Sequence, residues 1–215
     1  MSGIEASNAG QKSLEHMNGV PLPFEKTMPQ FIEAARKNGT WVCPTLITHW
    51  NRAHFQELPA KYKNDPRMQF TAPVLKRFWM GHTAEWSSDT HIQETLLQWR
   101  TNDVKTLHDD GIPIIAGTDL GFYYVFPGDL RAELAYYVEA GLSPLDAIRT
   151  ATINPAIYLN REKELGSVEK GKLADFVMLD ANPLDDIHNL HLIRTAVFNG
   201  RFFDRAALDA IMPKF

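Results

Sequence analysis

The sequence has little cysteine and no long hydrophobic run. Cys43 is the only cysteine among 215 residues, which excludes a disulfide within the chain and a cysteine-based metal cluster. No apolar stretch approaches the roughly 18–20 residues that cross a bilayer. The 26 acidic and 22 basic residues give a formal net charge of −4. This balance gives no electrostatic basis for binding nucleic acid or an anionic membrane surface, and we expect neither as a partner.

Motifs of several common enzyme classes are also missing. The chain has no G-x-S-x-G elbow, no phosphate-binding glycine loop, and neither H-E-x-x-H nor H-x-H. The first residues, MSGIEASNAG, lack the charged-then-apolar pattern of a secretory signal. They suit a cytoplasmic protein if Met1 is the natural start, and leave the compartment unknown if a signal lies upstream.

Up to about residue 160, short apolar strands alternate with amphipathic helices. The pattern predicts strands at 12–16, 40–47 and 112–116, and helices at 24–38, 91–110, 127–140 and from 143 onward. Residues 50–90 are less regular and predict one or two short helices. Strands that alternate with helices predict an α/β fold with a parallel sheet and right-handed crossovers. The run IPIIA at 112–116 is apolar enough to be a strand buried on both faces.

The pattern changes after about residue 165. Residues 173–180 predict a strand, and 195–204 predict a β-hairpin around Asn199-Gly200, a dipeptide typical of the type I′ turn. We therefore divide the chain into an alternating part, 1–160, and an antiparallel part, 161–215. A closed (β/α)8 barrel needs eight strand–helix units, so three such units can form only part of one.

Two polar side chains follow predicted strands, where parallel α/β folds collect their functional groups. Asp119 follows the strand at 112–116, and His16 follows the strand at 12–16. A carboxylate and an imidazole are suitable ligands for a divalent metal such as zinc, and the carboxylate can also accept a proton from water. Asp119 could equally be a turn or cap residue, and spacing alone favours an ordinary, partly buried role for His16.

Structural roles are favoured for the other polar candidates. His188 and His191 lie in a polar connector and predict a solvated loop. Glu15 could act beside His16 or pair with a nearby lysine. Cys43 sits in an apolar strand and predicts a core residue. The remaining histidines considered lie in or beside helical segments, where surface or packing roles are expected: His82, His91 and His108.

The second half of the chain resembles the end of the metal-dependent amidohydrolase superfamily, in its imidazolonepropionase-like and prolidase-like branch. The segment IPIIAGTD resembles the eighth barrel strand of that family. The match continues through PGDLRAELAYYVEAGLSPLDAIRTATINPA, GSVEKGKLADFVMLDANPLDDI and AVFNGRFFD. Upstream, SLEH resembles the end of the sixth strand and WVCPTL the seventh.

This resemblance implies a fold and a site. It implies that residues 1–160 are the last three units of a TIM-type barrel and that 161–215 supply the closing strands of a small β-sandwich. It implies that Asp119 binds the metal and handles the proton of the attacking water, and that His16 is a second metal ligand. The family's other ligands have no counterpart here, and Arg131 stands where relatives often have a histidine.

Two hypotheses of function remain open at this point. In the first, the full-length enzyme uses Zn2+ or another divalent metal to hydrolyse a C–N bond of an amide, cyclic amide or dipeptide-like substrate. The 215-residue chain alone is then expected to be inactive or nearly so, with weak or absent metal, because two ligands bind poorly. In the second, the chain is a non-catalytic, partner-dependent module. We expect a homo-oligomer or a complementing chain to cover its open sheet edge.

Overall fold

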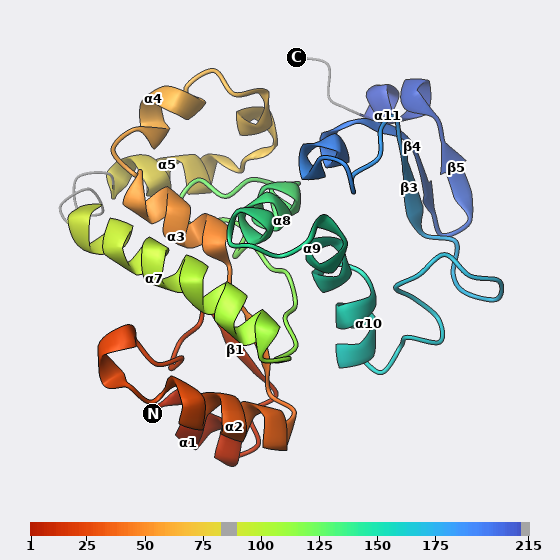
Figure 1. Cartoon of the computed structure of the whole chain (residues 1–215). Helices are drawn as coiled ribbons and strands as arrows, with labels where there is room; N and C mark the ends of the chain where they lie inside the picture. Colours follow the sequence, from red (N-terminus) through yellow and green to blue (C-terminus); the bar gives the residue numbers. More distant parts are fainter. Residues whose placement is uncertain (83–89, 212–215) are drawn as a thin grey trace. The chain divides into compact units, whose positions relative to one another are not determined.

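The computed structural model describes residues 1–82 and 90–211, and the chain divides into two compact units. Unit 1 spans Met1–Leu142 and unit 2 spans Ser143–Phe215. Figure 1 shows the elements of each unit in chain order. The sequence analysis assigned residues 143–160 to the barrel part, and that assignment stays a prediction. None of the described helices is both long enough and apolar enough to cross a membrane.

A short parallel sheet organises unit 1. Strand β1 (Ser13–Glu15) pairs in parallel with β2 (Trp41–Cys43), with Leu14 opposite Val42. A parallel bridge joins Val42 to Ile114, supported by a hydrogen bond from the Ile115 amide to the Val42 carbonyl of 3.0 Å. The first two predicted strands therefore pair, whereas the predicted strand at 112–116 is reduced to a single bridge residue, Ile114, beside β2.

The buried face of this sheet is an apolar row. Leu14, Val42 and Ile114 are opposite one another in the ladder and are all buried. Ile115 and Ala116, by contrast, are only partly buried. The expectation that residues 112–116 are buried on both faces is therefore wrong, because the described part of the chain covers only one face completely.

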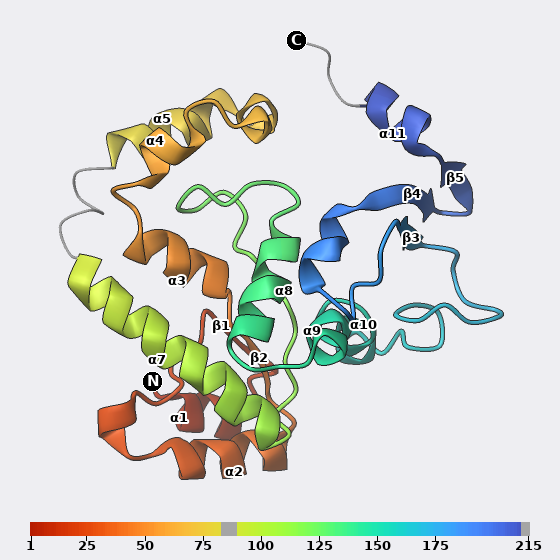
Figure 2. The same ribbon diagram turned by 45° about the horizontal axis from the view of Figure 1, so that its top comes forward.

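Helices surround the sheet and fill the connections in unit 1. Helices α3, α7 and α8 lie next to one another in both views (Figures 1 and 2). Gly39 ends α2 in the left-handed conformation, as the Asn-Gly pair predicts. The helices of the unit are α1 (Gly3–Asn8), α2 (Met28–Asn38), α3 (Leu46–Ala53), α4 (Leu58–Tyr62), α5 (Pro73–Gly81), α7 (Thr90–Asp109) and α8 (Leu130–Glu139), with 3-10 turns η1 (Pro23–Glu25) and η2 (Pro66–Phe70).

The second strand is shorter than predicted. Strand β2 stops at Cys43, and Leu46 and Ile47 begin α3 instead of continuing the strand. Pro44 explains the stop, because it has no backbone N–H to continue the ladder. The irregular stretch that follows holds three short helical segments up to residue 82, while residues 83–89 of the predicted excursion lie outside the described residues.

Unit 2 contains an antiparallel three-stranded sheet in the order β3-β4-β5. Asn199 and Gly200 both have positive φ, as the type I′ hairpin requires. Ser143 caps α9 by accepting a hydrogen bond from the Asp146 amide at 3.1 Å. The elements are α9 (Pro144–Thr150), α10 (Ile153–Tyr158), β3 (Phe176–Leu179), η3 (Ile187–His191), β4 (Ile193–Phe198), β5 (Arg201–Phe203) and α11 (Arg205–Ile211).

Candidate functional site

Strands β1 and β2 and the neighbouring segment bridged at Ile114 each lead into a residue with left-handed backbone. His16 directly follows β1, Thr45 comes two residues after β2, and Asp119 comes after the strand segment that contains Ile114; their φ angles are 57°, 51° and 54°. Histidine and aspartate tolerate this region better than most residues, but a β-branched threonine is a true outlier there. Strained backbone of this kind clusters at functional sites, so the shared strand end is the candidate site.

The side chains of these three residues converge. His16 Nδ1 lies 2.9 Å from Thr45 Oγ1 and 4.0 Å from Asp119 Oδ2. The His16 side chain is 37% exposed and that of Asp119 is 30% exposed. Thr45 is buried behind them. The imidazole and the carboxylate can therefore reach a ligand from the solvent side while the threonine hydroxyl supports the imidazole.

Backbone contacts explain the position of His16. Its amide donates to the Cys43 carbonyl at 2.9 Å, which extends the parallel ladder by one residue. The chain then turns, with Met17 also at positive φ and its side chain fully buried. Burial of the methionine anchors the turn, because removing so large an apolar side chain from water contributes about 2 kcal/mol.

Glu133 determines where α3 begins. The carboxylate of this residue in α8 is fully buried and accepts hydrogen bonds from the amides of Leu46 and Ile47, both at 2.7 Å. These amides belong to the first turn of α3, where N–H groups lack partners within the helix. Burial raises the pKa of Glu133 to about 7, against the lowering effect of the two amide donors. Glu133 therefore holds the helix start next to Thr45.

The segment that carries Asp119 passes close to β2. A Cβ atom on Gly117 would lie 2.6 Å from Cys43 Sγ, so a larger residue would force the buried Cys43 side chain or the backbone to shift. Cys43 itself is buried, as predicted, and burial raises its thiol pKa, with a further contribution from the negative charge of Glu15. This close approach places the segment that leads to Asp119 against the end of β2.

Tertiary hydrogen bonds hold the loop after Asp119. Tyr123 and Tyr124 also have positive φ, which neither side chain favours locally. The indole of Trp79 donates to the Gly121 carbonyl at 3.0 Å, and the Asn51 amide donates to the Tyr123 carbonyl at 2.7 Å. The loop conformation thus depends on residues that lie far away in the sequence.

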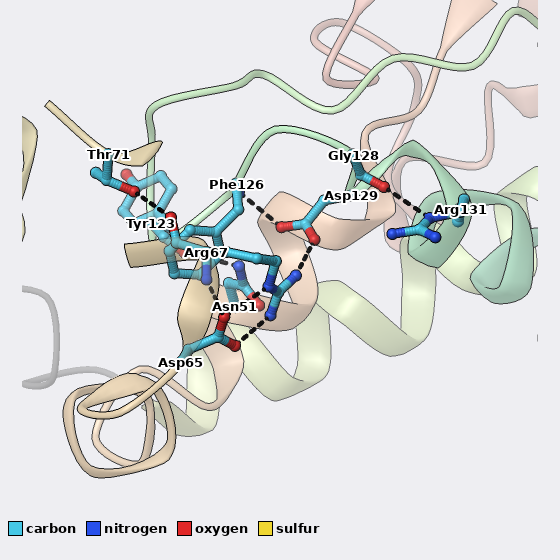
Figure 3. Close-up of polar contacts among 9 residues, drawn as sticks. All are labelled: Asn51, Asp65, Arg67, Thr71, Tyr123, Phe126, Gly128, Asp129 and Arg131. Atoms are coloured by element: carbon cyan, nitrogen blue, oxygen red, sulfur yellow. Dashed lines mark hydrogen bonds and ion pairs between the residues drawn. The ribbon is translucent and has the colours of Figure 1, made fainter. Parts of the chain in front are cut away.

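An ion-pair cluster fixes the end of the same loop (Figure 3). The Arg67 guanidinium lies between two carboxylates: it binds Asp65 through Nε and Nη2 at 3.0 and 2.8 Å, and it donates to Asp129 through Nη1. The other oxygen of Asp129 accepts from the Phe126 amide at 2.7 Å. Burial raises the pKa of Asp129, which Arg67 opposes. The segment after α4 is therefore tied to the loop that starts at Asp119.

A second histidine lies near the site and was not singled out from the sequence. Both ring nitrogens of His49 are buried and make no well-formed hydrogen bond within the described residues, although a backbone contact with His16 favours the charged ring. Burial, together with the positive charges of Arg100 and Arg52, lowers its pKa to about 4. His49 is thus neutral at pH 7. Its position on the first turns of α3, after a predicted strand, was the only sequence signal for it.

The other sequence candidates contact neighbours in the sequence or lie in unit 2. His82 Nδ1 lies 2.8 Å from the Phe78 carbonyl, and His91 Nδ1 lies 3.9 Å from a carboxylate oxygen of Glu94. Arg131 bonds the Gly128 carbonyl at 3.3 Å (Figure 3). His188 and His191 are exposed in unit 2, in a short 3-10 turn where a loop was predicted.

The donor set fits a divalent metal in type but is incomplete in number. His16 offers a ring nitrogen and Asp119 offers carboxylate oxygens, the ligands that zinc accepts in catalytic sites. Within residues 1–82 and 90–211, no group of three or more His, Cys, Asp or Glu side chains is placed to share one metal ion. Among the described residues this site therefore offers two possible donors, where catalytic zinc sites normally have three protein ligands.

Sequence comparison assigns the family. The model of the amidohydrolase family matches residues 2–205. The chain belongs to the amidohydrolase family. Imidazolonepropionase from Thermoplasma volcanium is 28% identical over 112 residues, and ochratoxinase from Aspergillus niger is 39% identical over 80 residues. The aligned segments cover 48% and 36% of this chain, but only 26% and 16% of those relatives.

Solved structures support the amidohydrolase fold along nearly the whole chain. Bottromycin amidohydrolase matches with a TM-score of 0.71 at 20% identity. The matched region covers 98% of this chain and 49% of the bottromycin amidohydrolase chain. A Xaa-Pro dipeptidase matches with a TM-score of 0.64 at 24% identity, and the matched region covers 94% of this chain and 42% of the dipeptidase chain. This amidohydrolase therefore spans less than half the length of these relatives.

Proposed function

We propose that this amidohydrolase chain carries part of a metal-dependent site that hydrolyses a C–N bond in an amide, cyclic amide or dipeptide-like substrate. The observation that carries the proposal is the approach of His16 Nδ1 and Asp119 Oδ2 to 4.0 Å, where His16 follows β1 and Asp119 follows the segment bridged to β2 at Ile114. The imidazolonepropionase, ochratoxinase and dipeptidase relatives support this class of substrate. In this proposal the chain corresponds to the last three barrel units and the closing sandwich strands.

The two side chains have different roles in the proposed reaction. His16 and Asp119 would hold a divalent metal, which supplies a bound water of lowered pKa and polarises the carbonyl. Asp119 accepts the proton that the attacking water loses as its oxygen bonds to the carbonyl carbon. The same carboxyl then delivers this proton to the leaving nitrogen as the C–N bond breaks. Water and amide thereby become acid and amine.

Metal binding tests the proposal directly. We expect the purified chain to bind Zn2+ weakly in isothermal titration, and we expect His16→Ala and Asp119→Asn each to remove this binding. His91→Ala is a matched control, because this exposed histidine lies in α7. Zn2+ binding that is unchanged in both site variants would contradict the proposal.

We expect little or no hydrolysis by the 215-residue chain alone, since two ligands hold metal poorly. Robust zinc-dependent hydrolysis of Xaa-Pro dipeptides or N-acyl amino acids by the isolated chain would show that this part of the proposal is wrong.

A second proposal is a partner-dependent module. Within the part of the chain that the structure describes, β1 has a neighbouring strand on one side only. An unpaired edge favours pairing with a second copy or with a complementing chain. Sedimentation as a monomer at micromolar concentration would argue against this module.

A further inference from the structure

We propose that Thr45 is a positioning residue that fixes the tautomer of His16, so that His16 presents Nε2 as its ligand atom. The inference deepens the proposed function and rests on it for the identity of the ligand. It assigns a role to a residue that neither the sequence patterns nor the family comparison singled out. Thr45 would act through His16 and would not touch the metal or the substrate.

The first argument is the count of protons at the Thr45 hydroxyl. Thr45 Oγ1 donates to the Pro44 carbonyl at 2.7 Å and also lies 2.9 Å from His16 Nδ1. A hydroxyl has one proton to donate and lone pairs with which to accept. A carbonyl can only accept, so we assign the proton to the contact with Pro44, and the contact with His16 then has Nδ1 carrying the hydrogen. In a neutral imidazole, Nε2 is then the nitrogen with the free lone pair.

The second argument is electrostatic. Asp119 Oδ2 lies 4.0 Å from the same ring nitrogen. A negative carboxylate on this side favours an N–H over a lone pair at Nδ1. The hydroxyl and the carboxylate therefore select the same tautomer, and both leave Nε2 available.

The third argument is the cost of the Thr45 conformation. Thr45 is buried and has a φ of 51°, although a β-branched residue avoids this region. Such an outlier costs on the order of 1–3 kcal/mol and persists only where the surroundings enforce it. As the N-cap residue of α3, Thr45 makes no side-chain capping bond, so capping does not account for the threonine. Its hydroxyl contacts Pro44 and His16 instead.

Hydrogen bonds from neighbouring groups commonly set the tautomer and orientation of metal-binding histidines, and their loss typically weakens metal binding by 10–100-fold. The valine variant Thr45→Val keeps the branched shape and removes only the hydroxyl. The serine variant Thr45→Ser keeps the hydroxyl. Thr48→Val is a matched control, because Thr48 is also buried at the start of α3 and donates instead to the Thr118 carbonyl at 3.2 Å.

The direct test is the tautomer of His16 in the metal-free, 15N-labelled chain at pH 8. Long-range 1H–15N correlation spectra distinguish the two ring nitrogens, and the His16→Gln variant assigns the signals. We expect a protonated Nδ1 in the wild type, in Thr45→Ser and in Thr48→Val. We expect Thr45→Val to shift His16 toward the Nε2–H form. A wild-type His16 in the Nε2–H form, or an unchanged tautomer in Thr45→Val, would overturn the inference.

A second readout uses the metal alone. We expect the Kd for Zn2+ to rise about 10–100-fold in Thr45→Val and to stay near the wild-type value in Thr45→Ser. An equal loss in Thr45→Ser would overturn the role of the hydroxyl. If the wild-type chain has the expected tautomer but its Zn2+ binding is unchanged in His16→Ala and Asp119→Asn, the proposed function fails while the tautomer assignment is supported.

Discussion

The strand ends of unit 1 and the hairpin turn of unit 2 both need residues with positive φ, but they obtain them in different ways. In the hairpin, Asn199 and Gly200 have φ angles of 50° and 71°, and both residue types adopt this region readily. In unit 1, Thr45 after β2 and Tyr124 in the loop after Asp119 have φ angles of 51° and 60°, with side chains that disfavour them. The hairpin conformation is local, whereas tertiary contacts impose the conformation of the candidate site.

This difference has an energetic consequence. A turn made from favourable residues depends little on its surroundings. Strand ends made from unfavourable residues depend on the groups that hold them, which here include Glu133, Trp79 and the Arg67 cluster. We therefore expect substitutions of the supporting groups in unit 1 to have larger effects than substitutions in the turn of unit 2.

The largest effect is expected for Glu133→Ala. This change leaves the amides of Leu46 and Ile47 buried without their acceptors. Each unsatisfied buried donor costs about 1–3 kcal/mol, so we expect the free energy of unfolding to fall by about 3 kcal/mol at pH 5.5. Urea denaturation measures this loss.

Glu139→Ala is the matched control, because Glu139 is an exposed carboxylate at the end of the same helix. We expect it to change the unfolding free energy by less than about 0.5 kcal/mol. Equal effects of the two substitutions would contradict the supporting role of Glu133.

The pH dependence sharpens the same comparison. The pKa of Glu133 is raised from 4.5 to about 7, chiefly by burial. A carboxyl with a raised folded pKa binds its proton more tightly in the folded state. Its contribution is complete below the unfolded pKa and is lost as pH rises through the folded value. The stability difference between wild type and Glu133→Ala should therefore shrink between pH 5 and pH 8, by up to about 3 kcal/mol at 1.36 kcal/mol per pKa unit.

Denaturation curves at several pH values test this prediction. A difference that stays constant from pH 5 to pH 8 would show that Glu133 does not titrate in this range. A difference that grows with pH would show that the two amide donors outweigh the burial of the carboxylate.

The sequence predicted the secondary structure best where local residues determine it. The Asn38-Gly39 helix end, the Ser143-Pro144 helix start and the Asn199-Gly200 turn are all confirmed. The prediction was less successful after Cys43, where apolar residues continue but the chain changes from strand to helix. An apolar run alone does not distinguish a strand from a buried helix, and the acceptor that starts this helix is Glu133, 87 residues from Leu46.

The candidate site could be predicted only in outline. The rule that function collects at strand ends pointed to His16 and Asp119, and their roles stay predictions. Thr45 also follows a strand, but nothing in the local sequence indicates that its hydroxyl contacts an imidazole 29 residues away. The same applies to Trp79 and Asn51, since the backbone carbonyls that they bind have no sequence signature.

The smallest effect is expected in the hairpin of unit 2. Gly200 has a φ of 71°, and a Cβ added there would meet no atom within 4 Å. Gly200→Ala therefore probes the backbone alone, and we expect it to lower the unfolding free energy by about 1 kcal/mol.

Gly81→Ala is the matched control: Gly81 ends α5, does not have a left-handed φ, and also has no atom within 4 Å of an added Cβ. We expect this change to stabilise by about 0.5 kcal/mol, since alanine favours helix more than glycine does. If the two changes in unfolding free energy have opposite signs, the cost at Gly200 comes from its φ angle, because neither glycine is crowded. If Gly200→Ala costs as much as Glu133→Ala, the contrast between the two regions is wrong.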